Sequence, residues 1–209
     1  MKLPPVRFDI RKYGVTKNML NYRKRGSFLF IILFFAGLFI SETGDVLAEE
    51  VLPSLSLAVP ASKEQRVYLG LTGAPGENFG PDDIKADILL IELFSMYCPY
   101  CQAEAPNVNA LFQLMEEKEK SGVILKIIGL GASNTAFEVD QFREAFDIKF
   151  PLFPDKSLEM YKKLGGEGTP GFLGIRLKKG EKPLIVLRQS GGFDSAEEFL
   201  SLLLQRAGY

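Results

Sequence analysis

The stretch ILLIELFSMYCPYCQAEAPNVNALFQ, residues 88–113, decides the fold of this chain. Its first seven residues, Ile88–Phe94, form an apolar run with a single charge, which is typical of a buried strand. The run breaks at residues 95–97, and the sequence Cys-Pro-Tyr-Cys at 98–101 then opens a segment with helical spacing of apolar residues. We therefore predict a central strand followed by a helix over residues 98–120, with a cysteine pair at its start.

These are the only two cysteines in the chain. At positions i and i+3 of a first helical turn, they lie on one face and can form a small disulfide. Cys98 lies near unpaired backbone N–H groups and the positive end of the helix dipole, which favour its thiolate. Pro99 suits an early helical position, where its missing N–H has no intrahelical partner. We interpret the pair as a redox-active dithiol in which Cys98 attacks and Cys101 resolves the mixed disulfide.

Two other interpretations of the cysteines are half of a zinc site and a pair of inert buried thiols. Structural zinc sites use four ligands, and the chain has no further cysteine and no histidine. Inert thiols would not need to stand between a buried strand and a helix. We therefore expect a redox centre with no metal and no cofactor.

The first 48 residues have the pattern of an export segment. Eight Lys and Arg residues stand in the first 25 positions against one Asp, and an uncharged apolar run of 13 residues, Phe28–Ile40, follows. This run is shorter than the ~20 residues that cross a membrane, and Val46-Leu47-Ala48 suits a cleavage site. We predict a signal peptide or, as the alternative, an uncleaved membrane anchor. In either case the cysteines reach the periplasm or another extracytoplasmic side.

Residues 49–209 form one domain's length of chain. They carry 17 Lys and Arg against 23 Asp and Glu, a net charge of −6. A mildly acidic domain without a basic stripe gives no support to nucleic-acid binding, so no nucleic-acid partner is expected.

The remaining pattern predicts alternating strands and helices, a closing hairpin and a last helix, which together indicate an α/β sandwich with a mixed sheet. Pro106 is expected to bend the long helix. The last helix is expected to begin at Asp194 or Ser195, with Ser195 and Glu198 as a capping box. Strands are expected at 55–59, 66–71, 88–94, 123–130, 150–153, 172–177 and 184–189, a loop at 72–81, and helices at 98–120, 135–146, 158–164 and beyond 195.

The helix over 135–146 has a predicted cap and a predicted buried face. Ser133 or Asn134 is expected to cap it. Four residues, Phe137, Phe142, Ala145 and Phe146, are expected to form its apolar face.

This pattern resembles the thioredoxin fold and, within it, the exported thiol:disulfide oxidoreductases of the TlpA-like and ResA-like group. The cysteine motif follows the central strand, and Pro106 lies five residues after the second cysteine. Thr169-Pro170 precedes the hairpin, and Gly191-Gly192 precedes the last helix. The resemblance implies a three-layer sandwich with a central mixed sheet, extra N-terminal strands and an inserted strand–helix unit over 123–146. One departure is Tyr97, where the family usually has Trp.

Glu92 lies six residues before Cys98 in an otherwise apolar strand. A buried carboxyl group needs a partner or a function. The resemblance implies that Glu92 occupies the position of the buried acid of thioredoxin and accepts the proton of Cys101. The alternative is a solvated Glu facing an edge of the sheet. Glu104 is expected to be a solvated helix residue.

The resemblance also implies a client-binding surface. Pro170 would follow a cis peptide bond, and the backbone of Thr169 would pair with an extended client segment. Pro99 is included in this surface. Three aromatic residues, Tyr97, Tyr100 and Phe172, are expected to surround the disulfide, with ordinary core packing as the alternative for Phe172.

The function implied is an extracytoplasmic oxidoreductase that reduces or exchanges disulfides of protein substrates and is recycled by a membrane electron donor. Three alternatives stay open. The chain could act as an oxidant like DsbA. The Pro99-Tyr100 pair and the turn over 191–195 are similar to glutaredoxins, which suggests coupling to glutathione. The fold could also serve as a redox-inactive binding module.

Overall fold

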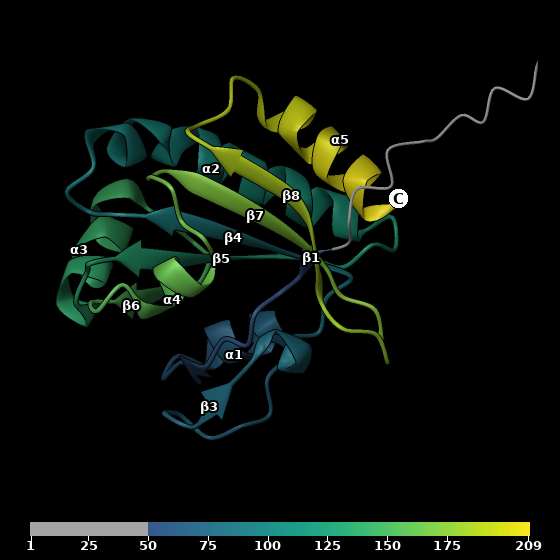
Figure 1. The fold of residues 1–209 in the computed structure, drawn as a ribbon, viewed down its shortest axis with the longest axis horizontal. Coiled ribbons are helices and arrows are strands. Elements are labelled where there is room, and N and C mark those ends of the chain that lie inside the picture. Colours follow the sequence, from purple (N-terminus) through teal and green to yellow (C-terminus); the bar gives the residue numbers. More distant parts are fainter. Residues whose placement is uncertain (1–49) are drawn as a thin grey trace, which may run out of the picture. The chain divides into compact units, whose positions relative to one another are not determined.

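The computed structural model describes residues 50–209 (Figure 1). The predicted export segment, residues 1–48, lies outside the described residues. The described part contains a six-stranded sheet in the order β1-β8-β7-β4-β5-β6. Strands β4, β5 and β6 run parallel, whereas β7 is antiparallel to β4, β8 to β7 and β1 to β8, so the sheet is mixed as predicted. The strands are β1 Glu50–Val51, β4 Ile88–Phe94, β5 Leu125–Ala132, β6 Leu152–Asp155, β7 Gly171–Arg176 and β8 Leu184–Ser190.

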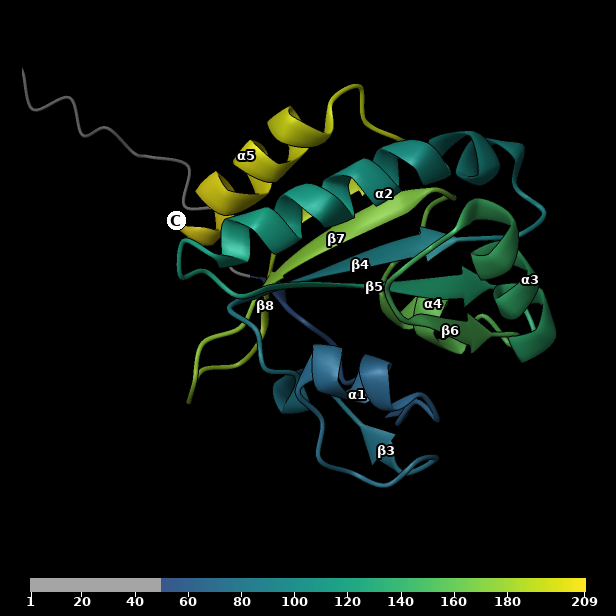
Figure 2. The same ribbon diagram turned by 180° about the vertical axis from the view of Figure 1, so that it is seen from behind.

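Helices and a small hairpin cover the two faces of this sheet (Figures 1 and 2). One face carries α2 (Pro99–Glu119), α3 (Ala136–Phe146) and α5 (Ala196–Ala207), whose buried side chains belong to one core cluster. The other face carries α1 (Lys63–Leu69), α4 (Glu159–Lys163) and the hairpin of β2 (Leu57–Ala58) and β3 (Asn78–Phe79), which contribute to a second cluster. The predicted three-layer sandwich with a mixed sheet, extra N-terminal strands and an inserted strand–helix unit is confirmed.

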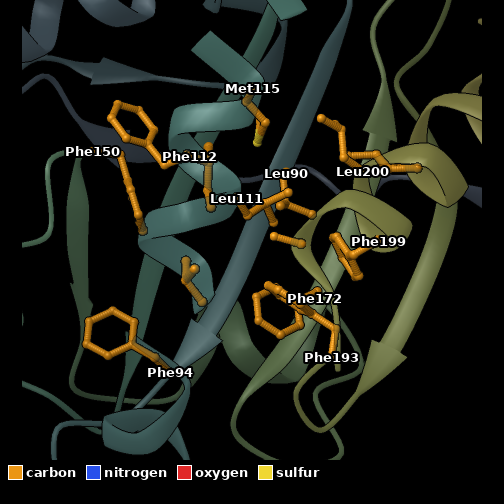
Figure 3. Packing of buried hydrophobic residues seen from close by; sticks show 14 of the residues in the cluster. Leu90, Phe94, Leu111, Phe112, Met115, Phe150, Phe172, Phe193, Phe199 and Leu200 are labelled. Carbon is orange, nitrogen blue, oxygen red and sulfur yellow. The ribbon is translucent and has the colours of Figure 1, made fainter. Parts of the chain in front are cut away.

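β4 is the central strand because its side chains pack into both clusters. Ile88, Leu90 and Phe94 belong to the cluster under α2 and α5, whereas Leu89, Ile91 and Leu93 belong to the opposite one. A strand covered on both faces reads as a continuous apolar run, which is why the sequence predicts its bounds correctly. Figure 3 shows Leu90 and Phe94 among the side chains of α2, together with Phe172, Phe193 and Phe199.

The long helix α2 begins where predicted, with Cys98 as its N-cap residue. It continues through Pro106 to Glu119, so the proline does not end it. Pro106 is exposed, and the residues that pack against the sheet lie on the other side of the helix, at Cys101, Ala105, Val108, Leu111, Phe112 and Met115.

The predicted strand over 66–71 is wrong, because this segment forms helix α1. The Ser62 side chain caps the helix by accepting a hydrogen bond from the backbone N–H of Gln65 at 3.2 Å. Gly70 ends it with φ of +69°, a conformation that suits glycine. Every second residue from Val67 is apolar, but Val67 is 71% exposed and Leu69 alone is buried within the helix. The predicted loop over 72–81 also contains β3, and a 3-10 turn follows at Pro81–Asp83.

Helix α3 is capped by Thr135 rather than by Ser133 or Asn134. Thr135 accepts from the N–H of Glu138, and the Glu138 carboxylate accepts from the Thr135 N–H at 2.6 Å, which completes a capping box. The predicted apolar face is partly wrong. Phe142 is buried, but Ala145 is exposed and Phe137 is 71% exposed.

The remaining elements lie close to their predicted positions. β5 and β6 each lie two residues later than expected, β7 and β8 form the predicted hairpin, and the Ser195 side chain caps α5. Within residues 50–209, no helix has the length and apolar character needed to span a bilayer.

Candidate functional site

The two cysteines lie at the C-terminal end of β4, at the start of α2. Cys98 is half-buried, whereas Cys101 is 0% exposed and faces the core beneath the helix. Both are free thiols in this structure, so their disulfide stays a prediction. One thiol is therefore open to a second molecule and the other is not.

The surroundings of Cys98 favour its ionised form. In its neutral form, the thiol donates to the carbonyl oxygen of Thr169 at 3.1 Å. Partial burial opposes ionisation, but the side chain of Thr169, the backbone N–H groups of Cys101 and Tyr100, and the Cys101 thiol together outweigh it and lower the pKa of Cys98. This is the environment that a nucleophilic thiol requires.

The surroundings of Cys101 instead disfavour its ionised form. Burial raises the pKa of its thiol to about 12, and the neighbouring Cys98 adds to this effect. At neutral pH, Cys101 is therefore a protonated, shielded thiol. It needs a proton acceptor before it can attack a disulfide.

Glu92 is buried beneath α2 with an exposed fraction of 1%, so the alternative of a solvated edge residue is wrong. Its neighbours in β4 on the same face, Leu90 and Phe94, belong to the cluster that contains Cys101. Neither carboxylate oxygen has a hydrogen-bond partner among the described residues. Burial, aided by the negative charge of Glu104, raises the pKa of Glu92 to about 8.

Glu104 has a structural contact that the sequence did not reveal. It is half-buried one turn after Cys101, and its Oε1 accepts a hydrogen bond from the backbone N–H of Phe193 at 3.0 Å. A Cβ on Gly192 would come within 2.4 Å of Glu104 Oε2, so the carboxylate would have to shift if this glycine were replaced. The i+3 spacing from Cys101 places Glu104 on the same side of α2 and could have suggested its proximity to the site.

The loop between β4 and α2 is held from two sides. The backbone N–H of Met96 donates to Asn134 Oδ1 at 2.9 Å, and Gln102 Nε2 donates to the carbonyl oxygen of Met96 at 2.8 Å. The hydroxyl of Tyr97 donates to the Glu138 carboxylate at the start of α3. These contacts fix the backbone that leads into Cys98.

The structure brings most of the predicted client-binding residues to the same place. Tyr97 and Tyr100 are exposed on either side of Cys98, and Pro99 occupies the first turn of α2. The Thr169–Pro170 peptide bond is cis, as predicted, and the contact between Cys98 and Thr169 brings it to the site.

Phe172 does not join this surface. It is 1% exposed and packs against Phe193 and Phe199, with ring centroids 5.3 and 5.4 Å away. The expectation that it surrounds the disulfide is wrong, and its ordinary-packing alternative is confirmed.

The arrangement can perform thiol–disulfide chemistry with its own side chains. It combines an accessible thiol of low pKa, a shielded thiol of high pKa and a buried carboxyl group. In residues 50–209, no three His, Cys, Asp or Glu side chains are grouped so that they could hold a metal ion.

Comparison with known proteins identifies the family. The Redoxin family model matches residues 52–178, which include both cysteines and Thr169-Pro170. The chain belongs to the Redoxin family. The family match covers the central strand, α2, the inserted β5–α3 unit and β7, the first strand of the closing hairpin.

Named relatives of this Redoxin-family chain agree with the resemblance drawn from its motifs. The thiol-disulfide oxidoreductase ResA of Bacillus cereus is 31% identical over 111 residues, which cover 50% of this chain and 61% of that protein. The ResA of Halalkalibacterium halodurans is 27% identical over 146 residues, covering 69% and 78%. The chain thus spans about three fifths of the Bacillus cereus relative. The predicted resemblance to the ResA-like group is confirmed.

Solved structures support the fold. The chain is similar to the thioredoxin domain of a thiol-disulfide oxidoreductase from Bacteroides vulgatus, with a TM-score of 0.53, 13% identity and coverage of 74% and 96%. It is also similar to StoA from Bacillus subtilis, with a TM-score of 0.50, 18% identity and coverage of 73% and 97%. Identities this low establish the thioredoxin-like fold alone.

Proposed function

We propose that this Redoxin-family chain is an extracytoplasmic thiol:disulfide oxidoreductase that reduces disulfides of protein clients. The observation that carries the proposal is the contrast between its two thiols. Cys98 is accessible and has a lowered pKa, whereas Cys101 is buried and its pKa is raised to about 12. An inert thiol pair or a passive binding surface would not need two neighbouring thiols of such different acidity.

The reaction would proceed in two exchange steps. The Cys98 thiolate attacks one sulfur of the client disulfide, a Cys98–client bond forms, and the other client sulfur leaves as a thiolate and takes up a proton. Cys101 then loses its proton and attacks Cys98. The client's second sulfur is released and protonated, and a Cys98–Cys101 disulfide remains. Two electrons and two protons pass to the client in total.

Glu92 is the group we assign as proton acceptor for Cys101. Its carboxylate can take the proton only when it is ionised. Because the pKa of Glu92 is raised to about 8, the ionised fraction grows as the pH rises from 7 towards 9. The second exchange step is therefore expected to accelerate over this range, and the Glu92→Gln variant should lose that acceleration.

Client binding is assigned to the surface around Cys98. The carbonyl oxygen of Thr169 lies 3.1 Å from Cys98 Sγ, so a backbone paired with Thr169 would bring a client sulfur next to the nucleophile. Tyr97, Pro99 and Tyr100 lie within two residues of Cys98 in the chain. With Pro170, they form the client-binding set.

Glutathione coupling receives less support. The proposed similarity to glutaredoxins rests on Pro99-Tyr100 and on the turn over 191–195, but the Phe193 N–H of that turn is bound by the Glu104 carboxylate. A disulfide-bearing protein is therefore the favoured substrate. An oxidant like DsbA uses the same chemistry in reverse, and the reduction potential distinguishes the two directions.

The location is proposed from the sequence of residues 1–48. The basic start, the apolar run Phe28–Ile40 and the acidic domain that follows support export, with the segment either removed or kept as an anchor. Outside the cytoplasm the dithiol needs a source of electrons. We assign recycling to an electron donor in the membrane.

An insulin-reduction assay with the full chain and dithiothreitol tests the activity. The native chain should precipitate insulin faster than dithiothreitol alone, and Cys98→Ser should remove the difference. After removal of dithiothreitol, pre-reduced Cys101→Ser should accumulate a mixed disulfide with insulin, because the first step remains possible. A native chain that performs no better than Cys98→Ser would refute the oxidoreductase assignment. A reduction potential near that of DsbA, about −120 mV, would refute the reducing direction, whereas a value near thioredoxin, about −270 mV, supports it.

A further inference from the structure

Three exposed aromatic side chains lie close to Cys98 in sequence or at the start of α3, and we call them the aromatic rim. Tyr97 is 66% exposed, Tyr100 76% and Phe137 71%. They are three of the seven large apolar side chains that are exposed within residues 50–209. Tyr97 and Tyr100 adjoin the nucleophile in sequence, and Phe137 lies in the first turn of α3.

The structure holds the start of α3, which contains Phe137, next to the loop that leads into Cys98. Glu138, its neighbour in α3, accepts a hydrogen bond from the hydroxyl of Tyr97. Asn134, which directly precedes the Thr135 cap of α3, accepts from the backbone N–H of Met96. Figure 2 shows that α2 and α3 begin at the same end of the sheet. The aromatic rim thus comes from two segments, the loop that leads through Cys98 into α2 and the start of α3, and hydrogen bonds connect these segments.

The same end of the sheet is strongly acidic. β4, β5, β6 and β8 end there and β7 begins there. The loops at this end and the first two turns of α2, α3 and α5 carry one basic residue, Lys156, and seven acidic residues, of which Asp140 forms an ion pair with Arg143. The other six are Glu104, Glu138, Glu167, Asp194, Glu197 and Glu198. The short helix α4 adds Lys162 and an ion pair between Glu159 and Lys163.

The carboxylates at this end of the sheet account for the net negative charge of residues 50–209. Residues 50–209 carry 17 Lys and Arg against 22 Asp and Glu, a net charge of −5. The six carboxylates and Lys156 together have the same net charge of −5. Elsewhere acidic side chains are balanced by cations, as in the pairs of Glu119 with Lys126 and Glu50 with Arg188.

We propose that the aromatic rim and its surrounding carboxylates dock clients whose disulfide is flanked by Lys or Arg. The inference rests on the proposed function and names the substrate class of the same site. Carboxylates attract a cationic segment over long range and favour its approach. A Lys or Arg side chain also binds favourably over a tyrosine or phenylalanine ring. The carboxylates and the rings together therefore select basic residues. An aromatic patch on a neutral surface, or an acidic surface without rings, would select them less strongly.

The test compares two peptides that differ only in charge. Both contain one intramolecular disulfide and a fluorophore–quencher pair that separates on reduction, with three Lys in one and three Glu in the other. The chain has no Trp, so the label supplies the signal. The full chain in reduced form is mixed with each peptide at ~20 mM and ~500 mM salt, with 2-hydroxyethyl disulfide as a neutral reference. At low salt, charge interactions extend over a Debye length of roughly 20 Å, whereas high salt screens them.

We expect the Lys peptide to react at least about tenfold faster than the Glu peptide at low salt, and the ratio to fall towards one at high salt. A triple variant, Asp194→Asn with Glu197→Gln and Glu198→Gln, should slow the Lys peptide by about three- to tenfold relative to the neutral disulfide. The control variant, Glu116→Gln with Glu117→Gln, neutralises exposed carboxylates at the other end of α2 and should leave the ratio unchanged.

A second pair of variants tests the rings. Phe137→Ala should slow the Lys peptide, whereas Val67→Ala, which truncates an equally exposed side chain on the opposite face, should not. Equal rates for the Lys and Glu peptides at both salt concentrations would overturn the inference while leaving the oxidoreductase activity intact. If neither the peptides nor the neutral disulfide react, the proposed function itself is wrong.

Discussion

Glu92 makes a quantitative prediction about how stability depends on pH. In the unfolded chain, its carboxyl group titrates near the ordinary value of 4.5, whereas in the folded protein the pKa is raised to about 8. Between these values, the folded state holds a proton that the unfolded state has released. Stability is therefore lost as the pH rises through this window, since the slope of the unfolding free energy is negative when the native state binds more protons.

The size of this stability loss follows from the difference between the pKa of Glu92 in the folded and in the unfolded chain. Each pH unit in the window costs about 1.4 kcal/mol. Integration from pH 5 to pH 8 gives a loss of about 3.5 kcal/mol for this single group. This is a large part of the roughly 5–15 kcal/mol that stabilises an ordinary domain. Glu92→Gln removes the titration while nearly preserving shape, so its stability should not contain this contribution.

The assay is urea unfolding of the reduced native chain and of Glu92→Gln at pH values from 5 to 8. Subtraction cancels the titrations that the two proteins share. The difference in unfolding free energy should shift by about 3.5 kcal/mol in favour of the variant across this range. Glu92→Asn, which shortens the side chain, controls for packing and should show the same pH dependence as Glu92→Gln. Parallel curves for the native chain and the Gln variant would show that Glu92 is solvated or paired in the folded protein, and the reasoning would fail.

Three further changes have defined outcomes. Glu104→Gln keeps an acceptor for the Phe193 N–H but removes a negative charge. The midpoint of the Glu92 titration in the urea assay should therefore fall below about 8. An unchanged midpoint would contradict the electrostatic effect of Glu104 on Glu92. Gly129→Ala would place a Cβ 2.4 Å from Leu152, so thermal unfolding should show a loss of about 1–3 kcal/mol, and a neutral result would mean that the sheet can adjust. Thr135→Ala removes the cap of α3 and should cost about 1 kcal/mol in the same measurement, whereas no loss would show that the cap is dispensable.

The sequence predicts those parts of the fold in which local pattern and burial agree. Ile88–Phe94 is covered on both faces, so every residue except Glu92 is apolar, and the strand bounds are correct. Ser195 caps α5 as predicted because side-chain capping is a local interaction. The cysteine motif is likewise a short sequence, whereas the cis bond before Pro170 is predicted only from the family resemblance.

The misses have two causes: local helix signals that the alternating pattern concealed, and tertiary contacts. The segment 66–71 has alternating apolar residues, but the cap at Ser62 and the left-handed turn at Gly70 make it helical. Phe137 and Phe172 have equal hydrophobicity, yet one is exposed at the redox end and the other is enclosed by rings from the last helix and the turn before it. No periodicity distinguishes them.

In the candidate site too, the sequence predicts the environment of some residues but not the contacts of others. The burial of Glu92 follows from its place in an apolar strand. The contact of Glu104 with the Phe193 N–H joins residues 89 positions apart, and it depends on a glycine at 192 that leaves room for the carboxylate. A contact of this kind is set by how α2 and the turn before α5 pack together, which sequence spacing alone does not determine.

The central claim is that Cys98 is the reactive thiol and Cys101 the shielded one. The most direct test is pH-dependent alkylation of the reduced native chain with iodoacetamide, followed by mass spectrometry that quantifies the label on each of the two cysteines. We predict that Cys98 is labelled with a midpoint below the ordinary thiol value of 9, and that Cys101 stays unlabelled until the pH approaches about 12. Equal labelling of the two cysteines, or faster labelling of Cys101, would contradict the account.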